Sequence, residues 1–294
     1  MIPRFLLVTG TDTGVGKTIA TAALAAALNA AGRRVIMCKP IQTGHIRSDD
    51  PEREQLESDY SDVVTESDAE AVARLTGIHA FTNTTLRLPM APVPAAKAEW
   101  DGFKSADDKA VDAESADPGP ADPGPVDPEP VDDEAAGAVP PDPDSPRADR
   151  VSNLPTAAEH VDFIRRALAR TDADHVLIEG SGGVLVDFGE HTVADIAAGL
   201  SEGENSVGAA IVVRSRLGTL NHTALTAEAL ERRRVSTTGI IIGSWPEKAS
   251  PVDRDNWAAL SAMAPVLGAI PAGVGDRLDR NEFAARAPGW LRLS

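Results

Sequence analysis

The stretch GTDTGVGKT, residues Gly10–Thr18, decides the expected fold, because it follows the apolar run FLLV and leads into an alanine-rich helical pattern. Glycines let the backbone approach a ligand closely, and a helix N-terminus presents free N–H groups to phosphate oxygens. Lys17 adds a positive charge, and the Thr18 hydroxyl is a potential Mg²⁺ ligand. The stretch therefore predicts a phosphate-binding loop rather than a purely structural turn, although five residues, not the common four, separate Gly10 from Gly16.

Beyond this loop, short β-branched runs alternate with helical patterns, which is typical of parallel strands joined by crossover helices. The strands read as continuous apolar runs, so helices should cover both faces of the sheet. The predicted fold is α/β and Rossmann-like, with a mostly parallel sheet. Strands are expected at Phe5–Val8, Val35–Cys38, His175–Glu179, Ala209–Val213, Gly239–Gly243 and Val266–Ile270. Helices are expected at Lys17–Ala31, Asp68–Thr76, Thr156–Arg170, Val193–Leu200, Asn221–Arg232, Arg254–Ala262 and Asn281–Arg286.

Composition excludes several classes of protein. A net charge of −17 argues against nucleic acid or an anionic membrane as partner. Apolar runs are too short for a membrane span, and the start MIPRFLLVTG is too quickly polar for a signal peptide, so we expect a cytoplasmic protein. The single cysteine, Cys38, rules out an internal disulfide framework and is expected to be a small core residue.

Residues 101–153 differ from the rest of the chain. The part from 101 to 150 holds ten of the 22 prolines and contributes −11 to the net charge, which leaves about −6 elsewhere. Proline removes backbone donors and few apolar side chains offset the ordering entropy, so we expect a disordered acidic, proline-rich insertion. A docking segment for a partner is the alternative. The chain is interpreted as one domain, 1–294, interrupted by this insertion.

Three further side chains stand near the expected strand ends, where ligands bind in such sheets. Lys39 in CKPIQTG either neutralises charge beside the phosphate loop or is an exposed strand-end lysine. Glu179 in IEGSGG suits a carboxylate that binds Mg²⁺. Asp68 opens a predicted helix, where it is either an N-cap or, with Thr18 and Glu179, part of an oxygen shell for the metal.

The ordered set of motifs resembles the dethiobiotin synthetases, ATP-dependent ligases of the P-loop NTPase superfamily. It comprises GTDTGVGKT, CKPIQTG, LPMAP (88–92), IEGSGG, LGTLNHT (217–223) and GSWPE (243–247). The resemblance implies that 7,8-diaminononanoate reacts with CO₂ to a carbamate, which attacks the γ-phosphate of ATP. The second amine then closes the ureido ring on the carbamic–phosphoric anhydride and releases phosphate.

The resemblance also implies residue roles. Lys17 and Lys39 would be catalytic, and Thr18, Asp68 and Glu179 would hold Mg²⁺. The nucleotide would bind Gly14, Val15, Gly16, Lys17, Thr18, Ile19, Asp68, Glu179, Gly180, Ser181, Gly182, Gly243, Ser244, Pro271, Ala272 and Gly273. The substrate would bind Thr43, Pro89, Met90, Ala91, Gly218, Thr219, Leu220 and Asn221. In the family the LGTLNHT stretch reaches across from a second subunit, so a homodimer is expected.

Gly243 departs from the family pattern, because many relatives carry an adenine-reading Asn there. More permissive contacts from Gly243, Ser244 and PAG (271–273) are expected instead. Two alternatives share the phosphate loop. One is another carbon–nitrogen ligase, although such enzymes generally add a glutamine-hydrolysing domain. The other is an ATPase switch of the partitioning or cell-division type (ParA or MinD), although its signature lysine is replaced by Thr11.

Overall fold

The computed structural model describes residues 2–100, 154–201, 206–275 and 277–293. Expectations about the segment 101–153 therefore lie outside the described residues. The elements, in chain order, are β1 (Phe5–Gly10), α1 (Lys17–Ala30), β2 (Val35–Gln42), α2 (Arg53–Asp59), α3 (Asp68–Thr76), β3 (His79–Thr85), α5 (Ala157–Ala169), β4 (His175–Gly183), α6 (Val193–Gly199), β5 (Val207–Val213), α7 (Thr219–Glu231), β6 (Ser236–Trp245), α8 (Pro251–Met263), β7 (Val266–Pro271), α9 (Arg280–Arg286) and the 3₁₀ turn η1 (Ala287–Gly289). Residues 92–100 are also helical.

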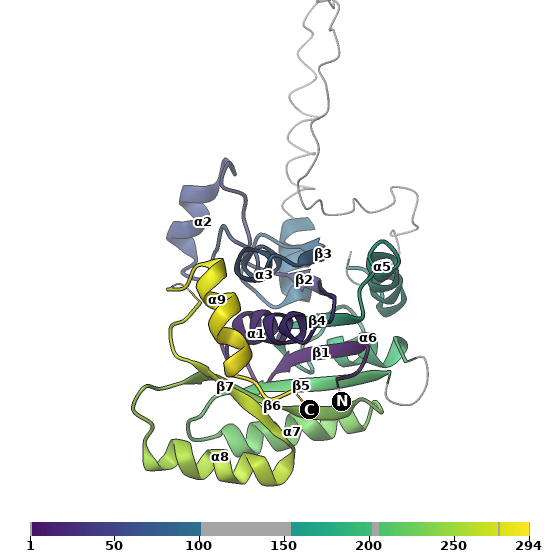
Figure 1. The fold of residues 1–294 in the computed structure, drawn as a ribbon. Coiled ribbons are helices and arrows are strands. Elements are labelled where there is room, and N and C mark those ends of the chain that lie inside the picture. The colour runs from purple at the N-terminus through teal and green to yellow at the C-terminus, as the bar shows by residue number, and fades with distance from the viewer. Residues whose placement is uncertain (1, 101–153, 202–205, 276, 294) are drawn as a thin grey trace, which may run out of the picture.

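Seven parallel strands form one sheet in the order β3-β2-β4-β1-β5-β6-β7 (Figure 1). β1 lies at the centre, paired with β4 on one side and β5 on the other. All six residues of β1 are buried. Because every strand runs in the same direction, the loops that follow their carboxyl ends all meet at one edge of the sheet.

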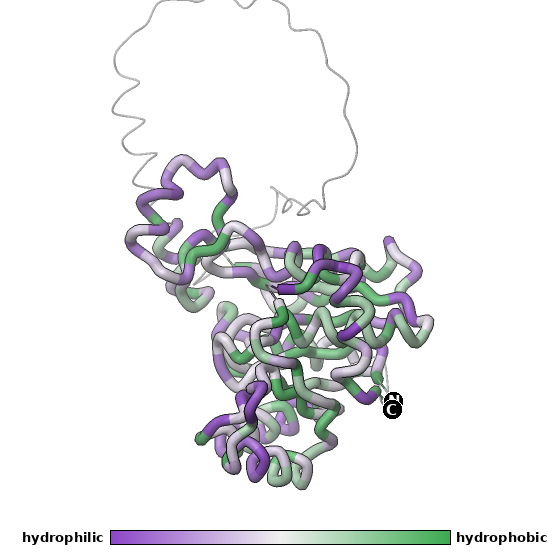
Figure 2. Tube along the Cα trace, turned by 60° about the vertical axis from the view of Figure 1, so that its left-hand side comes forward, coloured by the Kyte–Doolittle hydropathy of each residue, from purple (hydrophilic) through white to green (hydrophobic). Residues whose placement is uncertain are grey.

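Helices cover both faces of this sheet. One hydrophobic cluster joins the strands to α1, α3 and α9, and a second joins the opposite face to α5, α6, α7 and α8. Successive strand residues alternate between them, since Leu6 and Val8 belong to the first cluster whereas Phe5 and Leu7 belong to the second. Hydrophobic residues concentrate in the layered interior, and hydrophilic ones gather on the outer turns (Figure 2). The α/β prediction is confirmed, and Cys38 is a buried core residue as expected.

Three differences from the predicted elements have physical reasons. β3 (HAFTNTT) was not predicted, because this partly exposed edge strand has no continuous apolar run. α2 was not predicted either, because none of its residues is buried and its sequence has no apolar face. β2 and β4 are each four residues longer than predicted, so Lys39 and Glu179 lie inside the strands rather than at their ends.

Candidate active site at the phosphate loop

The phosphate loop connects β1 to α1 through a tight turn. Gly14 and Gly16 adopt positive φ angles of 66° and 93°, which side chains with a Cβ rarely tolerate. Gly16 is the N-cap of α1, and no described side chain caps this helix, whose first turn carries no acidic residue. The amide groups at the start of α1 therefore remain available to an anion. Lys17 is nearly buried, and its Nζ donates to the Asp12 carbonyl oxygen at 3.0 Å.

Lys39 is buried at the centre of a charge cluster whose member Asp68 is partly exposed. Its Nζ lies 2.5 Å from Asp68 Oδ2 and 3.0 Å from Glu179 Oε1, and it also donates to the carbonyl oxygen of Gly180 at 3.2 Å. The Thr18 hydroxyl lies 2.8 Å from Asp68 Oδ1 and 3.1 Å from Glu179 Oε1, and can donate its proton to one of them at a time. Four elements, α1, β2, α3 and β4, thus converge on one point. Lys39 is only 2% exposed, so it is not a solvated strand-end lysine.

The charges in this cluster support one another. Burial works against the charge of Lys39, but Asp68 and Glu179 outweigh it and raise its pKa. Burial also works against the charge of Asp68, yet Lys39 holds the pKa of this carboxyl low. Complete burial raises the pKa of Glu179, although Lys39 opposes the shift. Burial, reinforced by the charge of Lys39, lowers the pKa of Lys17 to about 8. The charges of Lys39, Asp68 and Glu179 therefore depend on one another, whereas Lys39 works against the charge of Lys17.

The space for this cluster arises where two strands separate. β2 pairs with β4 only as far as Cys38 and Ile178, whereas its pairing with β3 continues to Gln42. Pro40, which has no N–H to donate, lies in the stretch beyond the β4 pairing. Ser181 uses its hydroxyl to bridge this divergence, donating to the carbonyl oxygen of Ile41. Its hydroxyl is therefore engaged by the protein itself.

Asp68 is the first residue of α3 but not its cap. Ser67 is the N-cap and accepts a hydrogen bond from the Glu70 backbone N–H at 3.2 Å, while Glu70 Oε2 accepts from the Ser67 N–H at 2.7 Å. The N-cap alternative for Asp68 is wrong, because the neighbouring serine satisfies the helix and leaves the aspartate free to reach Lys39 and Thr18.

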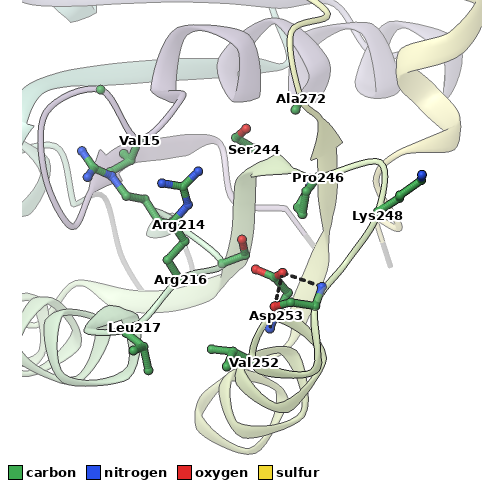
Figure 3. Close-up of a pocket in the computed structure, with 13 residues that line it drawn as sticks. Val15, Arg214, Arg216, Leu217, Ser244, Pro246, Lys248, Val252, Asp253 and Ala272 are labelled. Carbon is green, nitrogen blue, oxygen red and sulfur yellow. Dashed lines mark hydrogen bonds between the residues drawn. The ribbon is translucent and has the colours of Figure 1, made fainter.

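A cavity of about 760 Å³ opens beside the phosphate loop (Figure 3). Of the predicted nucleotide contacts, Gly14, Val15, Ser244 and Ala272 line it. Three cations that were not predicted also line it, namely Arg214, Arg216 and Lys248, with the two arginines on the side opposite Lys248. These three cations outnumber the one carboxylate of the lining, Asp253, so the cavity favours an anionic occupant.

Arg214 follows β5 directly and holds the phosphate loop. Its Nη2 donates to the Thr13 carbonyl oxygen at 2.8 Å and lies 3.5 Å from Asp12 Oδ2. Its position directly after an apolar strand, at the same end of the sheet as the loop, was the sequence signal for Arg214.

Thr21 was also not predicted. Its buried hydroxyl donates to Glu179 Oε2 at 2.7 Å, and helical spacing from Thr18 was the available signal.

Gly243 packs directly against the phosphate loop. A Cβ at this position would lie 2.0 Å from the Val15 carbonyl oxygen, and a Cβ at Gly16 would lie 2.6 Å from the Gly243 carbonyl oxygen. The two backbones touch, so the position admits no side chain without movement of the loop. The next residue, Ser244, lines the cavity.

The remaining predicted nucleotide residues lie around this edge. Gly182 has a positive φ of 66°, and a Cβ there would lie 3.5 Å from the Thr13 hydroxyl. Ile19 packs against Gly275, Pro271 ends β7, and Gly273 lies beside the Arg277 guanidinium.

The predicted substrate residues fall into two groups. Thr43 adjoins LPMAP, because Gly44 donates its N–H to the Leu88 carbonyl oxygen at 3.1 Å and a Cβ at Gly44 would lie 2.9 Å from Pro89. Met90 and Ala91 are exposed beside them.

The second group, Gly218, Thr219, Leu220 and Asn221, begins α7 after β5. β4 and β1 separate β5 from β2, which amounts to roughly 14 Å at ~4.8 Å per strand. Within one chain, this group therefore lies apart from Thr43. The Thr219 hydroxyl is buried and finds no hydrogen-bond partner among the described residues.

The oxygen donors at Thr18, Asp68 and Glu179 fit Mg²⁺, which prefers hydroxyl, carboxylate and phosphate oxygens. In the described part of the chain, no cluster of three or more His, Cys, Asp or Glu side chains could hold a metal by itself. A cation here would thus depend on phosphate oxygens as additional ligands.

No described helix has the length and apolar character needed to span a bilayer.

Comparison with known proteins places this site in context. An AAA domain family model matches residues 4–109 and 144–273, leaving 110–143 unmatched. A solved structure of the cell division ATPase MinD from Pyrococcus furiosus matches 97% of each chain at 15% identity and a TM-score of 0.43, too low a likeness to bear on function.

Three similar proteins are named ATP-dependent dethiobiotin synthetase BioD. The protein from Mycobacterium sp. (strain JLS) is 34% identical over 97% of both chains. That from Mycobacterium avium is 37% identical over 97% of this chain and 93% of its own. That from Streptomyces avermitilis is 37% identical over 97% of this chain and 91% of its own. At this identity over nearly the full length, the chain belongs to the ATP-dependent dethiobiotin synthetase family.

Proposed function

We propose that this protein joins 7,8-diaminononanoate and CO₂ to form dethiobiotin, with conversion of ATP to ADP and phosphate. The observation that carries the proposal is the convergence of Lys17, Lys39, Asp68 and Glu179 on the phosphate loop, in a chain whose full-length relatives are named as dethiobiotin synthetases. No observation favours a second function of comparable weight.

The reaction proceeds in three bond-forming steps. One amine of the substrate attacks CO₂ and loses a proton, which gives a carbamate. A carbamate oxygen then attacks the γ-phosphorus of ATP and displaces ADP. Finally the second amine attacks the carbonyl carbon of the carbamic–phosphoric anhydride, closes the ureido ring and releases phosphate.

The protein supplies lysine side chains where negative charge develops on the phosphate and carbamate oxygens. The backbone from Gly14 to Thr18 wraps the phosphates, and Lys17 neutralises them at the start of α1. Lys39, which is held by Asp68 and Glu179, is the cation proposed to stabilise the carbamate and the transferring phosphoryl group. Cations that are already oriented stabilise the transition state without reorganising during the reaction. Thr43 hydrogen-bonds the carbamate or a substrate amine.

Thr18, Asp68 and Glu179 are the residues that would hold Mg²⁺. When bound, the ion would neutralise phosphate charge during phosphoryl transfer. The same carboxylates also hold Lys39, and Thr21 fixes the second oxygen of Glu179.

Ser244 and the segment 271–273 are the proposed base contacts. Because Gly243 is closed against Val15, recognition of the base lacks the side-chain amide found in many relatives. We therefore expect acceptance of other nucleoside triphosphates besides ATP.

A homodimer completes the site in this proposal. The amides that begin α7 form a nest suited to the substrate carboxylate, and the buried Thr219 hydroxyl beside them is a further donor. Because this group lies about three strand spacings from Thr43 in its own chain, the partner subunit would supply it. Sedimentation of the full chain should give a dimer, and a monomer with full activity would contradict this part of the proposal.

The decisive assay combines purified protein, 7,8-diaminononanoate, bicarbonate, Mg²⁺ and each nucleoside triphosphate in turn. Dethiobiotin and phosphate should form in equal amounts, and both should require the diamine. Phosphate release that is independent of the diamine, without dethiobiotin, would instead indicate an ATPase switch. Coupled product formation from a different amine or acid would indicate another carbon–nitrogen ligase.

A further inference from the structure

Gln42 is a buried amide whose two ends are both committed. It is the last residue of β2 and is 6% exposed. Its Oε1 accepts a hydrogen bond from the Asp68 backbone N–H at 3.1 Å, and its Nε2 donates to the Thr43 carbonyl oxygen at 3.0 Å. The amide oxygen meets a donor and the amide nitrogen meets an acceptor, so a single orientation of the amide group satisfies both hydrogen bonds.

The bond to Asp68 satisfies a group that α3 cannot satisfy by itself. N–H groups in the first turn of a helix have no partner within the helix. Ser67 and Glu70 form a capping box that uses the N–H groups of Glu70 and Ser67. The capping box does not use the N–H of Asp68. This N–H instead donates a hydrogen bond to Gln42, which lies on β2.

Gln42 thereby helps to fix the distance between Asp68 and Lys39. Lys39 lies three residues before Gln42 on the same strand, and its Nζ contacts the Asp68 carboxylate at 2.5 Å. One strand thus holds both the side chain of Asp68, through Lys39, and its backbone, through Gln42. The other end of the same amide holds the backbone of Thr43.

We propose that Gln42 is a positioning residue, which aims Asp68 at the metal and Thr43 at the substrate without touching either ligand. The inference rests on the proposed function, in which Asp68 is a metal ligand. Partners that orient metal ligands in this way usually change metal affinity or activity by about 10–100-fold when they are removed.

The test is a titration of Mn²⁺ into the full-length protein with bound ADP, followed by electron paramagnetic resonance. Gln42→Met keeps the length of the side chain but removes both hydrogen bonds, and should weaken Mn²⁺ binding about tenfold. Gln55→Met is the matched control on exposed α2, where Gln55 donates to Asp59, and should bind Mn²⁺ as the wild type does. In an Asp68→Asn background, Gln42→Met should cause no further loss, because its effect acts through Asp68.

A second variant separates positioning from general damage to the fold. Gln42→Glu retains an oxygen to accept from the Asp68 N–H but loses the donor to Thr43. It should restore Mn²⁺ affinity to within about threefold of wild type while raising the KM for the diamine, with little change in kcat. Unchanged affinity in Gln42→Met, an equal loss in Gln42→Glu, or an additive loss with Asp68→Asn would each overturn the inference. If the wild type with ADP binds no Mn²⁺, the proposed metal site itself fails.

Discussion

Replacing Lys39 by Met should damage both catalysis and stability, and the loss of stability should depend on pH. Lys39 lies between two carboxylates at 2.5 and 3.0 Å, and Glu179 is completely buried. Removing one partner of a buried ion pair leaves an uncompensated charge and typically costs about 3–5 kcal/mol. We expect a loss of this size at pH 8.

Lower pH should restore part of this stability. Burial already raises the pKa of Glu179 while Lys39 opposes the shift, so removing Lys39 should raise that pKa further. The folded variant then binds a proton more tightly than the unfolded chain does. Its stability therefore rises as pH falls from the folded pKa toward the ordinary value of about 4.3, by roughly 1.4 kcal/mol per pH unit. Part of the stability lost at pH 8 should therefore return when the pH is lowered to 6.5.

The assay is urea unfolding of wild type and Lys39→Met at pH 8 and pH 6.5, together with dethiobiotin formation at pH 8. The exposed Lys97→Met, the same substitution outside the cluster, should be within ~0.5 kcal/mol of wild type at both pH values. Dethiobiotin formation by Lys39→Met should fall at least about 100-fold. Equal stability losses at both pH values, or retained turnover, would refute the assigned role of Lys39.

Three other predictions address the loop, a buried histidine and the acidic segment. Gly243→Ala should lose about 1–3 kcal/mol and weaken ADP binding, because its Cβ would lie 2.0 Å from the Val15 carbonyl oxygen. Gly289→Ala, with open space around its Cβ, is the control, and equal calorimetric isotherms for both would contradict the packing argument. His160 is fully buried, and burial lowers its pKa to about 3, so the unfolded chain takes up the proton first as pH falls below about 6.5. Wild type should therefore lose about 2 kcal/mol by pH 5, a loss that His160→Gln should not show in urea unfolding. Deleting the unmatched residues 110–143 should leave the melting temperature within about 3 °C and dethiobiotin formation intact, because their composition offers little apolar surface.

The alternating α/β pattern and the phosphate loop could be predicted from the sequence, because both depend on local chemistry. Continuous apolar runs are typical of strands in a parallel sheet that is covered on both faces, and GVGKT between such a strand and a helix is typical of a phosphate loop. Where the local signal was weak, prediction failed. The polar edge strand β3 and the exposed helix α2 have no apolar pattern of their own.

Which side chains contact one another became evident from the packing of the elements. The sequence allowed Lys39 to be either a cation beside the phosphate loop or an exposed strand-end lysine. Its burial between carboxylates from α3 and β4 excludes the exposed alternative. Because Ser67 caps α3, the Asp68 side chain can contact other elements. No sequence motif indicates the contacts of Gln42 and Thr21. The strand order β3-β2-β4-β1 brings Thr18 and Glu179, which are 161 positions apart, within hydrogen-bonding distance. Such distances depend on how the layers pack, and no local pattern of residues encodes that.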